Sequence, residues 1–332
     1  MSYRVLIIGC GAIAGGYDAD RPDCAPPLSH AGAFTADDRF EIVACVDPDD
    51  AARAAFADRW GIARHAATID GLHAQEGEFE VVSVCSPTAF HARNMADAIA
   101  LRPRLVFCEK PVADLLDEAR RLVEMCDRSG VALAVNYTRR WAPDIVRLAR
   151  EVQSGAWGRV LSAAGWYTKG VVHNGGHMID LLRMIVGEVE LAACGAPVHD
   201  FWDDDPTVPA LLGGPNGSNI HLVAGDARAF TQFELLVSCE KGEFAMRDGG
   251  FRIETRRVDA SDTFAGYRTL NAREDIAGRY EEAMACAAAN IADHLDHGKP
   301  LASTGKNALA AQALCEVARH ESINRDKDNP RP

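Results

Sequence analysis

Lys110 has a type and a position in the sequence that are suited to ligand binding or catalysis. It belongs to Glu109-Lys110-Pro111, which follows an apolar run from Leu105 to Cys108 that is typical of a buried strand. A lysine at the carboxyl end of a parallel strand sits where open α/β sheets bind ligands, and the proline stiffens the turn. Lysines at strand ends are also commonly solvated surface residues. Motifs elsewhere in the sequence are needed to distinguish a ligand-binding lysine from a solvated surface lysine.

His177 is the second such side chain, in the stretch from His173 to Asp180. Paired glycines precede it and allow a close approach of the backbone to a ligand, and an apolar helical pattern follows it. A histidine at a helix start beside such glycines is suited to proton transfer at neutral pH. The two histidines and the aspartate could also suggest a metal site. No thiolate or second carboxylate cluster completes a ligand set, so no metal is predicted.

A glycine-rich turn near the N-terminus predicts a cofactor. The run Tyr3 to Ile8 is typical of a buried parallel strand, and Gly9-Cys10-Gly11-Ala12-Ile13-Ala14 follows it directly. This is G-x-G-x-x-A, the strand-to-helix turn whose backbone N–H groups approach a diphosphate. We expect cofactor contacts at Gly9, Gly11, Ala12 and Ile13. The alternative is an ordinary structural glycine turn.

Asp47 favours NAD over NADP. It ends a predicted strand from Phe40 to Val46, where a carboxylate accepts hydrogen bonds from ribose hydroxyls and repels a 2′-phosphate. Asp47 lies further from the glycines than usual, because an Asp- and Pro-rich insertion, Tyr17 to Leu28, intervenes. We interpret that insertion as a lid over the cofactor site. Asp47 could instead cap the predicted helix Asp49 to Trp60.

Alternating strands and helices in the first half predict a doubly wound parallel sheet. Further strands are expected at Val81–Cys85, Leu105–Cys108 and Val131–Val135, and helices at His91–Leu101 and Asp114–Ser129. We interpret Val131–Val135 as the sixth strand of the sheet, and six parallel strands form a full dinucleotide-binding unit. We therefore predict an NAD(P)-binding Rossmann domain over 1–136. Ser86-Pro87 and His91 follow the strand at Val81, and His91 could be a helix-start residue with no further role.

The second half has a different pattern. A strand is expected at Val160–Tyr167, and alternating segments with glycine-rich turns between Glu190 and Val258 indicate a mostly antiparallel sheet. Helices are expected over Pro143 onward, Glu274–His297 and Thr304–His320. This predicts an α+β substrate-binding and oligomerisation domain over 137–323, with homodimers or homotetramers formed through its sheet. Residues 324–332 are expected to be a disordered tail.

Two arginines follow the predicted domain boundary. Arg139 and Arg140 come shortly after Asn136 in an otherwise acidic chain. They could bind a carboxylate or phosphate of a substrate, or they could pair with acidic side chains between the domains.

Composition limits the class of protein. The chain has 332 residues, 48% hydrophobic and 25% charged, with a net charge of -13. This charge argues against nucleic acid or an anionic membrane as the main partner. The ten cysteines are scattered without a CxxC pair, as in a reduced cytosolic protein. With no membrane-spanning or leader pattern either, we expect a cytoplasmic location.

Taken in order, these motifs resemble the glucose–fructose oxidoreductase/inositol dehydrogenase family, often written Gfo/Idh/MocA. The resemblance covers nearly the whole chain. It rests on Gly9-x-Gly11-x-x-Ala14, Asp47, Ser86-Pro87 with His91, Glu109-Lys110-Pro111, Asn136 with Arg139-Arg140-Trp141-x-Pro143, and Gly176-His177-x-x-Asp180. It implies a Rossmann domain, a C-terminal domain with a large open sheet used in dimers or tetramers, and hydride transfer between a nicotinamide and a hydroxyl carbon of a sugar, cyclitol or sugar derivative.

The resemblance also implies roles for single residues. Lys110 and His177 match the active-site lysine and histidine, and the peptide bond before Pro111 is expected to be cis. Expected cofactor contacts are Gly9, Gly11, Ala12, Ile13, Asp47, Ser86, Pro87, His91, Glu109 and Lys110. Expected substrate contacts are Lys110, Asn136, Arg139, Arg140, His173, Asn174 and His177.

His173 departs from the family pattern, which commonly places an aspartate four residues before the histidine. Asn174 is neutral too, so the expected site loses a fixed negative charge. We interpret His-Asn-Gly-x-His as a subgroup feature in which His173 holds or relays a proton to Lys110 and His177. Two alternatives remain: an NAD-using glycoside hydrolase or lyase that recycles its cofactor internally, and a non-catalytic NAD-binding sensor.

Overall fold

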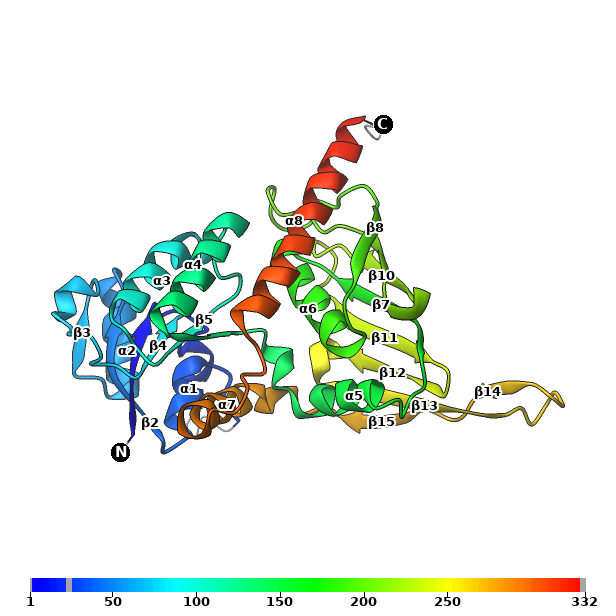
Figure 1. Cartoon of the computed structure of the whole chain (residues 1–332), viewed down its shortest axis with the longest axis horizontal. Coiled ribbons are helices and arrows are strands. Elements are labelled where there is room, and N and C mark those ends of the chain that lie inside the picture. The colour runs from blue at the N-terminus through cyan, green and yellow to red at the C-terminus, as the bar shows by residue number, and fades with distance from the viewer. Residues whose placement is uncertain (1, 22–25, 329–332) are drawn as a thin grey trace. The chain divides into compact units, whose positions relative to one another are not determined.

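The computed structural model describes residues 2–21 and 26–328 (Figure 1). The chain divides into two compact units. Unit 1 comprises the described residues up to Trp141 together with Glu281–Leu309, and unit 2 comprises Ala142–Tyr280 and the described residues from Ala310 onward. The first division lies slightly after the boundary that we predicted at Asn136. The return of Glu281–Leu309 to unit 1 has no counterpart in the sequence analysis.

Unit 1 contains a six-stranded parallel sheet in the order β3-β2-β1-β4-β5-β6. Its strands are β1 (Tyr3–Ile8), β2 (Phe40–Val46), β3 (Arg64–Ala66), β4 (Val81–Val84), β5 (Leu105–Cys108) and β6 (Ala132–Val135). The residues of β4 and β5 are all buried, as expected for strands covered on both faces. This is the strand order of a complete Rossmann domain, so the predicted fold class is confirmed.

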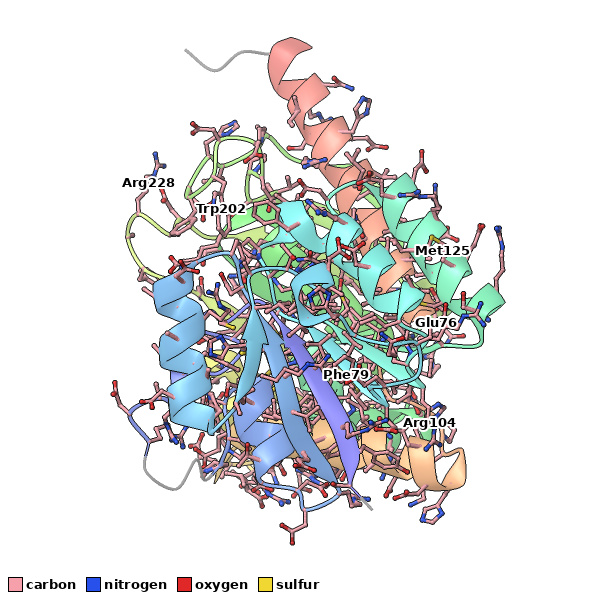
Figure 2. All side chains as sticks on the ribbon, turned by 90° about the vertical axis from the view of Figure 1, so that its left-hand side faces the viewer. Glu76, Phe79, Arg104, Met125, Trp202 and Arg228 are labelled. Atoms are coloured by element: carbon pink, nitrogen blue, oxygen red, sulfur yellow. The ribbon has the colours of Figure 1, made fainter. Side chains whose placement is uncertain are left out.

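Helices of unit 1 connect and cover these strands. They are α1 (His30–Thr35), α2 (Asp50–Trp60), α3 (His91–Ala100), α4 (Leu116–Ser129) and α7 (Ala283–His297). Helix α7 packs on α1, and Arg39 after α1 donates to Asp293 of α7 at 3.1 Å. Arg104 donates to the carbonyl of Leu295 and lies over the Tyr3 ring at 5.3 Å (Figure 2). These contacts explain why α7 joins unit 1 despite its distance in sequence.

The insertion interrupts the helix that follows the glycine turn. In the turn Gly15 N donates to Gly11 O at 3.2 Å and Tyr17 N to Ala12 O at 2.9 Å, and a short helical turn follows at Gly16–Asp18. The helix resumes at α1, where His30 N donates to Ile13 O at 3.1 Å and Ala31 N to Ala14 O at 2.8 Å. Part of the predicted lid, residues 22–25, lies outside the described residues.

Asp18 ties the two ends of this insertion together. Its carboxylate accepts from the backbone of Leu28 at 3.0 Å and of Ser29 at 2.8 Å, and from the Ser29 hydroxyl at 2.5 Å. Arg21 pairs with it at 3.6 Å. Ser29 in turn caps α1 by accepting from Gly32 N. The buried aspartate therefore fixes the point at which the helix resumes.

Unit 2 is built on a nine-stranded mixed sheet. The order is β14-β13-β12-β11-β7-β10-β9-β8, with β15 also paired to β13. Its strands are β7 (Val160–Tyr167), β8 (Glu190–Cys194), β9 (Ala210–Gly213), β10 (Asn219–Ala224), β11 (Phe233–Cys239), β12 (Gly242–Arg247), β13 (Arg252–Ala260), β14 (Arg268–Leu270) and β15 (Glu274–Ala277). Only the β7–β10 pair among them is parallel, as a mostly antiparallel sheet requires.

Helix α6 (Gly176–Ile185) packs on one face of this sheet and α5 (Pro143–Gln153) lies beside it. At Gly165 of β7 a Cβ atom would lie 2.6 Å from the Met178 sulfur, so glycine allows α6 to approach the sheet. Short helical turns occur at Gly16–Asp18, Asp70–Leu72, Thr88–Phe90, Thr138–Arg140, Pro215–Gly217, Asp248–Gly250 and Tyr280–Glu282, and a π-helical segment at Gly170–Gly175.

Two predicted elements differ in the structure. The predicted helix from Glu274 begins only at Ala283, and Glu274–Ala277 forms strand β15 instead, because it pairs with β13 before Gly278 ends the run. Helix α8 (Gly305–Asp328) continues beyond His320 into the expected tail, so residues 324–328 are helical rather than disordered. Residues 329–332 of that tail lie outside the described residues.

Within the described residues no helix is both long and apolar enough to cross a bilayer.

Candidate functional site

The glycine turn leaves room for a diphosphate. Gly9 has a φ of +90°, and a Cβ there would lie 2.6 Å from the backbone nitrogen of Ser86, so only glycine lets the ends of β1 and β4 approach. Gly11 is exposed, and a Cβ there would meet no atom within 4 Å. Ala12 and Ile13 follow in the same open turn. The turn therefore fits the backbone approach that a dinucleotide needs.

Asp47 stands at the end of β2 beside this turn. Its carboxylate accepts from Cys10 N at 2.7 Å and from Asp49 N at 2.8 Å. Asp49, not Asp47, caps α2 by accepting from Ala51 and Ala52. The alternative that Asp47 is the helix cap is therefore wrong. Each of its oxygens keeps a lone pair for a ribose hydroxyl.

His91 holds two turns of unit 1 together. Its Nε2 lies 2.7 Å from the carbonyl of Ser86 and its Nδ1 2.6 Å from the carbonyl of Pro111. The side chain is buried, and Ser86 also accepts from Asn94 at 2.8 Å. His91 thus joins the turn after β4, which contains Ser86 and Pro87, to the turn after β5. The alternative of a helix-start residue with no further role is wrong.

Glu109-Lys110-Pro111 follows β5 as predicted, and the Lys110–Pro111 peptide bond is cis. Glu109 N donates to Val84 O at 2.9 Å, which fixes the start of the turn at the neighbouring strand. The Glu109 carboxylate points into a buried network. Its Oε1 accepts from Asn136 Nδ2 at 2.6 Å and lies 2.9 Å from His30 Nε2.

His30 is the residue of this network that the sequence analysis missed. It is fully buried, and its Nδ1 lies 2.7 Å from Ser83 Oγ of β4. Burial would lower the pKa of His30, but Cys85 and Glu109 outweigh it and raise that pKa to about 10. Burial would likewise raise the pKa of Glu109, but the hydrogen bonds from His30 and Asn136 lower it. Their hydrogen bond therefore favours the charged forms of both groups, an imidazolium and a carboxylate.

Asn136 and the two arginines also lie in unit 1. Asn136 is buried, and besides Glu109 it accepts from Thr138 Oγ1 at 3.2 Å. Arg140 donates to the carbonyl of Ala302 at 3.3 Å, and both arginines are partly exposed in the turn Thr138–Arg140. Their contact with a substrate stays a prediction.

His173, Asn174 and His177 lie in unit 2, where a π-helical segment runs directly into α6. Asp205 organises this segment: its carboxylate accepts from Val172 N and His173 N, each at 2.9 Å. Burial raises the pKa of Asp205. The turn is tight, because a Cβ at Gly170 (φ +79°) would lie 2.1 Å from Asp205 Oδ2. Lys110 and His177 belong to different units, so their meeting at one site stays a prediction.

An aromatic loop approaches His173. The loop between β8 and β9 carries Trp202, which is labelled in Figure 2, and Phe201. Their rings contact each other at 4.4 Å. The Trp202 ring also lies 4.6 Å from the His173 ring, and Lys169 Nζ lies 4.9 Å from the Phe201 ring. Asp200 anchors the loop by accepting from Lys169 N at 2.9 Å. Phe201 remains 55% exposed, so the loop presents an aromatic surface beside the histidine.

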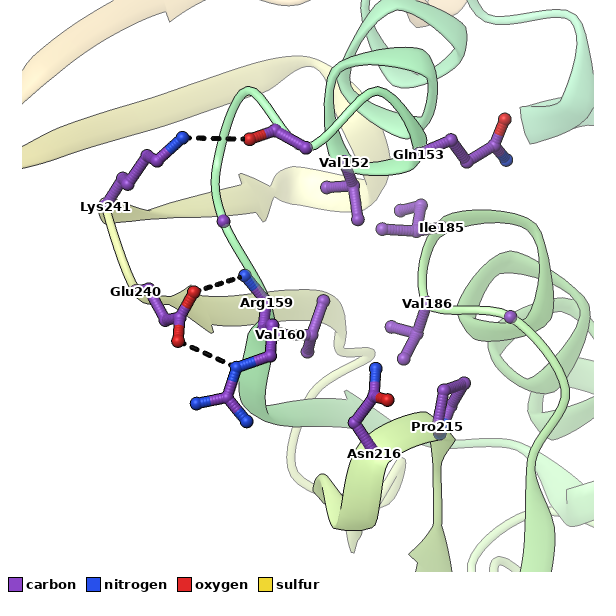
Figure 3. Close-up of a pocket in the computed structure, with 13 residues that line it drawn as sticks. Val152, Gln153, Arg159, Val160, Ile185, Val186, Pro215, Asn216, Glu240 and Lys241 are labelled. Atoms are coloured by element: carbon purple, nitrogen blue, oxygen red, sulfur yellow. Dashed lines mark hydrogen bonds and ion pairs between the residues drawn. The ribbon is translucent and has the colours of Figure 1, made fainter.

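A pocket of about 490 Å³ in unit 2 lies elsewhere (Figure 3). Val152, Ile185 and Val186 form its apolar part. Its charged residues satisfy one another or the backbone: Arg159 pairs with Glu240 at 2.7 Å, and Lys241 donates to Gly155 O at 3.1 Å. None of the predicted site residues lines this pocket. No group of three or more His, Cys, Asp or Glu side chains is placed to hold a metal ion in the part of the chain that the structure describes.

Comparisons with known proteins indicate an oxidoreductase. Residues 3–137 match the Gfo/Idh/MocA family, described as "Oxidoreductase family, NAD-binding Rossmann fold". Over these residues the chain is similar to the Gfo/Idh/MocA family of oxidoreductases. The predicted NAD(P)-dependent oxidoreductase with a Rossmann domain is thereby confirmed.

Similar proteins match over almost the full chain. D-apiose dehydrogenase from Paraburkholderia graminis is 26% identical, over 95% of this chain and 86% of that protein. Inositol 2-dehydrogenase from Rhizobium meliloti is 24% identical, over 87% and 91%. The crystal structure of an oxidoreductase from Agrobacterium radiobacter with NAD+, L-tartaric acid and magnesium has a TM-score of 0.74 at 20% identity, covering 98% of this chain and 97% of that one, and shows the shared fold.

Proposed function

We propose that this chain is an NAD-dependent dehydrogenase that oxidises a hydroxyl carbon of a sugar, cyclitol or sugar derivative. The observation that carries the proposal is the turn after β5, where Lys110 directly follows Glu109, whose carboxylate is held by His30 and Asn136 at the carboxyl end of the parallel sheet. The family match and the sugar and inositol dehydrogenases among the similar proteins support it. Asp47 supports NAD rather than NADP, because its carboxylate would repel a 2′-phosphate.

Residues of unit 1 would hold the cofactor. The open turn at Gly11, with Ala12 and Ile13, would take the diphosphate, and Asp47 would accept from the ribose hydroxyls. Ser86, Pro87, His91 and Glu109 fix the two turns on either side of the expected nicotinamide position. A bound nicotinamide supplies the hydride acceptor.

Residues of both units would move the proton. In the proposed reaction the carbinol C–H bond breaks with its electron pair leaving as hydride, and the O–H proton passes to His177. The products are a ketone or aldehyde, NADH and a proton. Lys110 would hydrogen-bond the hydroxyl and stabilise the negative charge that develops on its oxygen. Arg139 or Arg140, with Asn136 and Asn174, would hold the rest of the substrate.

His173 would relay the proton from His177 or hold the substrate in the His-Asn-Gly-x-His subgroup to which we assign the chain. The Asp205 carboxylate supports this assignment, because it fixes the segment that carries His173 and leads into α6, where His177 lies. The Trp202 ring would cover the apolar face of a sugar next to His173.

The exposed face of the unit 2 sheet supports assembly as a homodimer or homotetramer. Because Gly165 of β7 faces α6, its neighbours Ala164 and Trp166 point to the other face, where they are partly exposed. Leu236 pairs with Ala164 on that face. We expect Ala164→Arg to produce monomers in light scattering after gel filtration. An unchanged oligomer would place the interface elsewhere.

The test of the proposed reaction is NAD reduction across a panel of sugars and cyclitols. We expect NADH to form with one of them, and Lys110→Met and His177→Ala to abolish its formation. Undiminished turnover in either variant would remove that residue from the chemistry. Product release from a glycoside without net NADH would favour the recycled-cofactor hydrolase or lyase, and tight NAD binding without any turnover would favour the sensor.

A further inference from the structure

His30 is a buried ionisable residue that the proposed reaction does not use. Both ring nitrogens of His30 have partners, Ser83 Oγ at 2.7 Å and Glu109 Oε1 at 2.9 Å. A neutral imidazole with its one N–H on Nε2 would need the Ser83 hydroxyl to donate to Nδ1, whereas an imidazolium donates from both nitrogens. The carboxylate oxygen requires a donor from Nε2, and the short distance is typical of a charge-assisted hydrogen bond.

The groups that surround His30 come from several elements of unit 1. Glu109 follows β5 and Cys85 follows β4, and these are its titratable neighbours. The Phe107 ring of β5 lies 4.4 Å away, and the Asn136 amide after β6 lies 3.3 Å from Nε2. Asp18 belongs to the insertion, and its carboxylate accepts a hydrogen bond from Ser29 N and pairs with Arg21. Among the described residues, Glu109 is therefore the partner of His30 whose carboxylate is aimed at the ring.

Glu109 immediately precedes Lys110, and the charge of Lys110 helps to lower the pKa of Glu109. This electrostatic interaction is reciprocal, so the charge state of Glu109 acts on Lys110. When His30 is an imidazolium, the charges of His30 and Glu109 cancel. When that charge is missing, the Glu109 carboxylate next to Lys110 in the chain has lost the cation of His30.

We propose that His30 is a positioning residue for Lys110: it neutralises the Glu109 carboxylate from behind, so that the lysine ammonium is directed to the substrate hydroxyl rather than held by its neighbour. The proposal rests on the proposed function for the role of Lys110, but the charge pairing itself does not. The insertion contributes because Asp18 and Ser29 fix the residue at which α1 resumes, which is His30.

The alternative is that His30 only fills space and satisfies hydrogen bonds. Three variants separate the two roles. His30→Gln keeps an amide donor and loses the charge. Glu109→Gln removes the carboxylate. The double variant contains two neutral amides, so the net charge behind Lys110 returns to zero.

The lysine can be titrated directly, without any catalytic activity. The chain has only six lysines, so 13C labelling of the lysine side chains gives few NMR signals, and Lys110→Met assigns the one of interest. We expect His30→Gln to raise the titration midpoint of Lys110 by about one pH unit, because an ammonium beside an uncompensated carboxylate keeps its proton longer. The double variant should return the midpoint to the wild-type value, and Glu109→Gln should not raise it.

Equal Lys110 midpoints in the wild-type protein, His30→Gln and the double variant would overturn the proposal, as would a neutral His30 ring in 15N spectra at pH 8. If His30→Gln does not fold, a raised midpoint in Glu109→Gln would contradict the proposal equally well. Kinetics then separate the two claims. Absence of NAD reduction by wild-type protein with an intact Lys110 shift refutes the proposed function alone, whereas turnover without the shift refutes the role of His30 alone.

Discussion

The His30–Glu109 pair predicts that the folded chain loses stability as the pH rises from neutral to alkaline. The perturbation is pH itself, applied to wild-type protein and to His30→Gln. The folded-state pKa of His30 is about 10, against 6.5 for an ordinary histidine. A group whose pKa is raised by folding stabilises the protein fully below the unfolded pKa, and that stability is lost as the pH rises through the folded pKa.

The magnitude follows from this rise. At about 1.4 kcal/mol for each pH unit, the pair stabilises the folded state by up to about 5 kcal/mol below pH 6.5. Between pH 6.5 and 10 this contribution disappears at up to about 1.4 kcal/mol per unit. Glu109 has the opposite dependence: its pKa is lowered by folding, so its contribution is present above the ordinary glutamate pKa and lost as the pH falls through the folded pKa.

The assay is urea denaturation of both proteins at several pH values between 6.5 and 10. The other titrating groups are common to both chains, so the difference in unfolding free energy isolates His30. We expect that difference to shrink as the pH rises. If wild-type and His30→Gln stabilities change in parallel over this range, His30 is not an imidazolium in the folded protein and the reasoning about its charge is wrong.

Three further predictions concern other sites. Asp47→Ala should weaken NAD binding roughly tenfold and reduce the preference for NAD over NADP, because a hydrogen bond to the ribose contributes about 1–2 kcal/mol. Isothermal titration calorimetry measures both affinities. An unchanged affinity for NAD would show that Asp47 does not contact the cofactor. Gly170→Ala should lower the free energy of unfolding by more than about 2 kcal/mol, because the new Cβ would clash with the Asp205 carboxylate. The control Gly155→Ala has a similar φ but open space around its Cβ, and it should lower the free energy of unfolding by only about 1 kcal/mol. Equal losses of stability in urea denaturation would contradict the packing argument. Trp202→Ala should raise KM for the sugar several-fold with kcat little changed, because the ring would contact substrate without touching the reacting atoms; a loss confined to kcat would place the ring elsewhere in the mechanism.

Sequence periodicity was sufficient for most of unit 1, because its strands are short runs of buried apolar residues bounded by turn residues. The bounds of β1, β2 and β5 agree with the predicted runs residue for residue. The cis peptide bond before Pro111 was expected from the family resemblance and is present. Local pattern and motif were enough in these cases.

Tertiary pairing explains what the sequence could not show. Glu274–Ala277 is compatible with a helix on its own, and only its pairing with β13 makes it a strand. His30 lies just beyond the insertion, and nothing local marks it as the partner of Glu109, 79 residues away. Its one signal was a histidine directly after the helix-capping Ser29. The contact of Trp202 with His173 could not be predicted from the sequence either, because it depends on the hydrogen bonds by which Asp200 anchors the loop.

The central claim is hydride transfer from a sugar-type alcohol to NAD with Lys110 and His177 in the chemistry. The measurement that tests it most directly is NADH formation by wild-type, Lys110→Met and His177→Ala proteins on the same panel of sugars and cyclitols, with NAD binding measured in each to show an intact cofactor site. The account predicts turnover in the wild-type protein and a loss of at least about a hundredfold in both variants with NAD still bound. Full turnover in either variant, or none in wild-type protein that binds NAD, would contradict it.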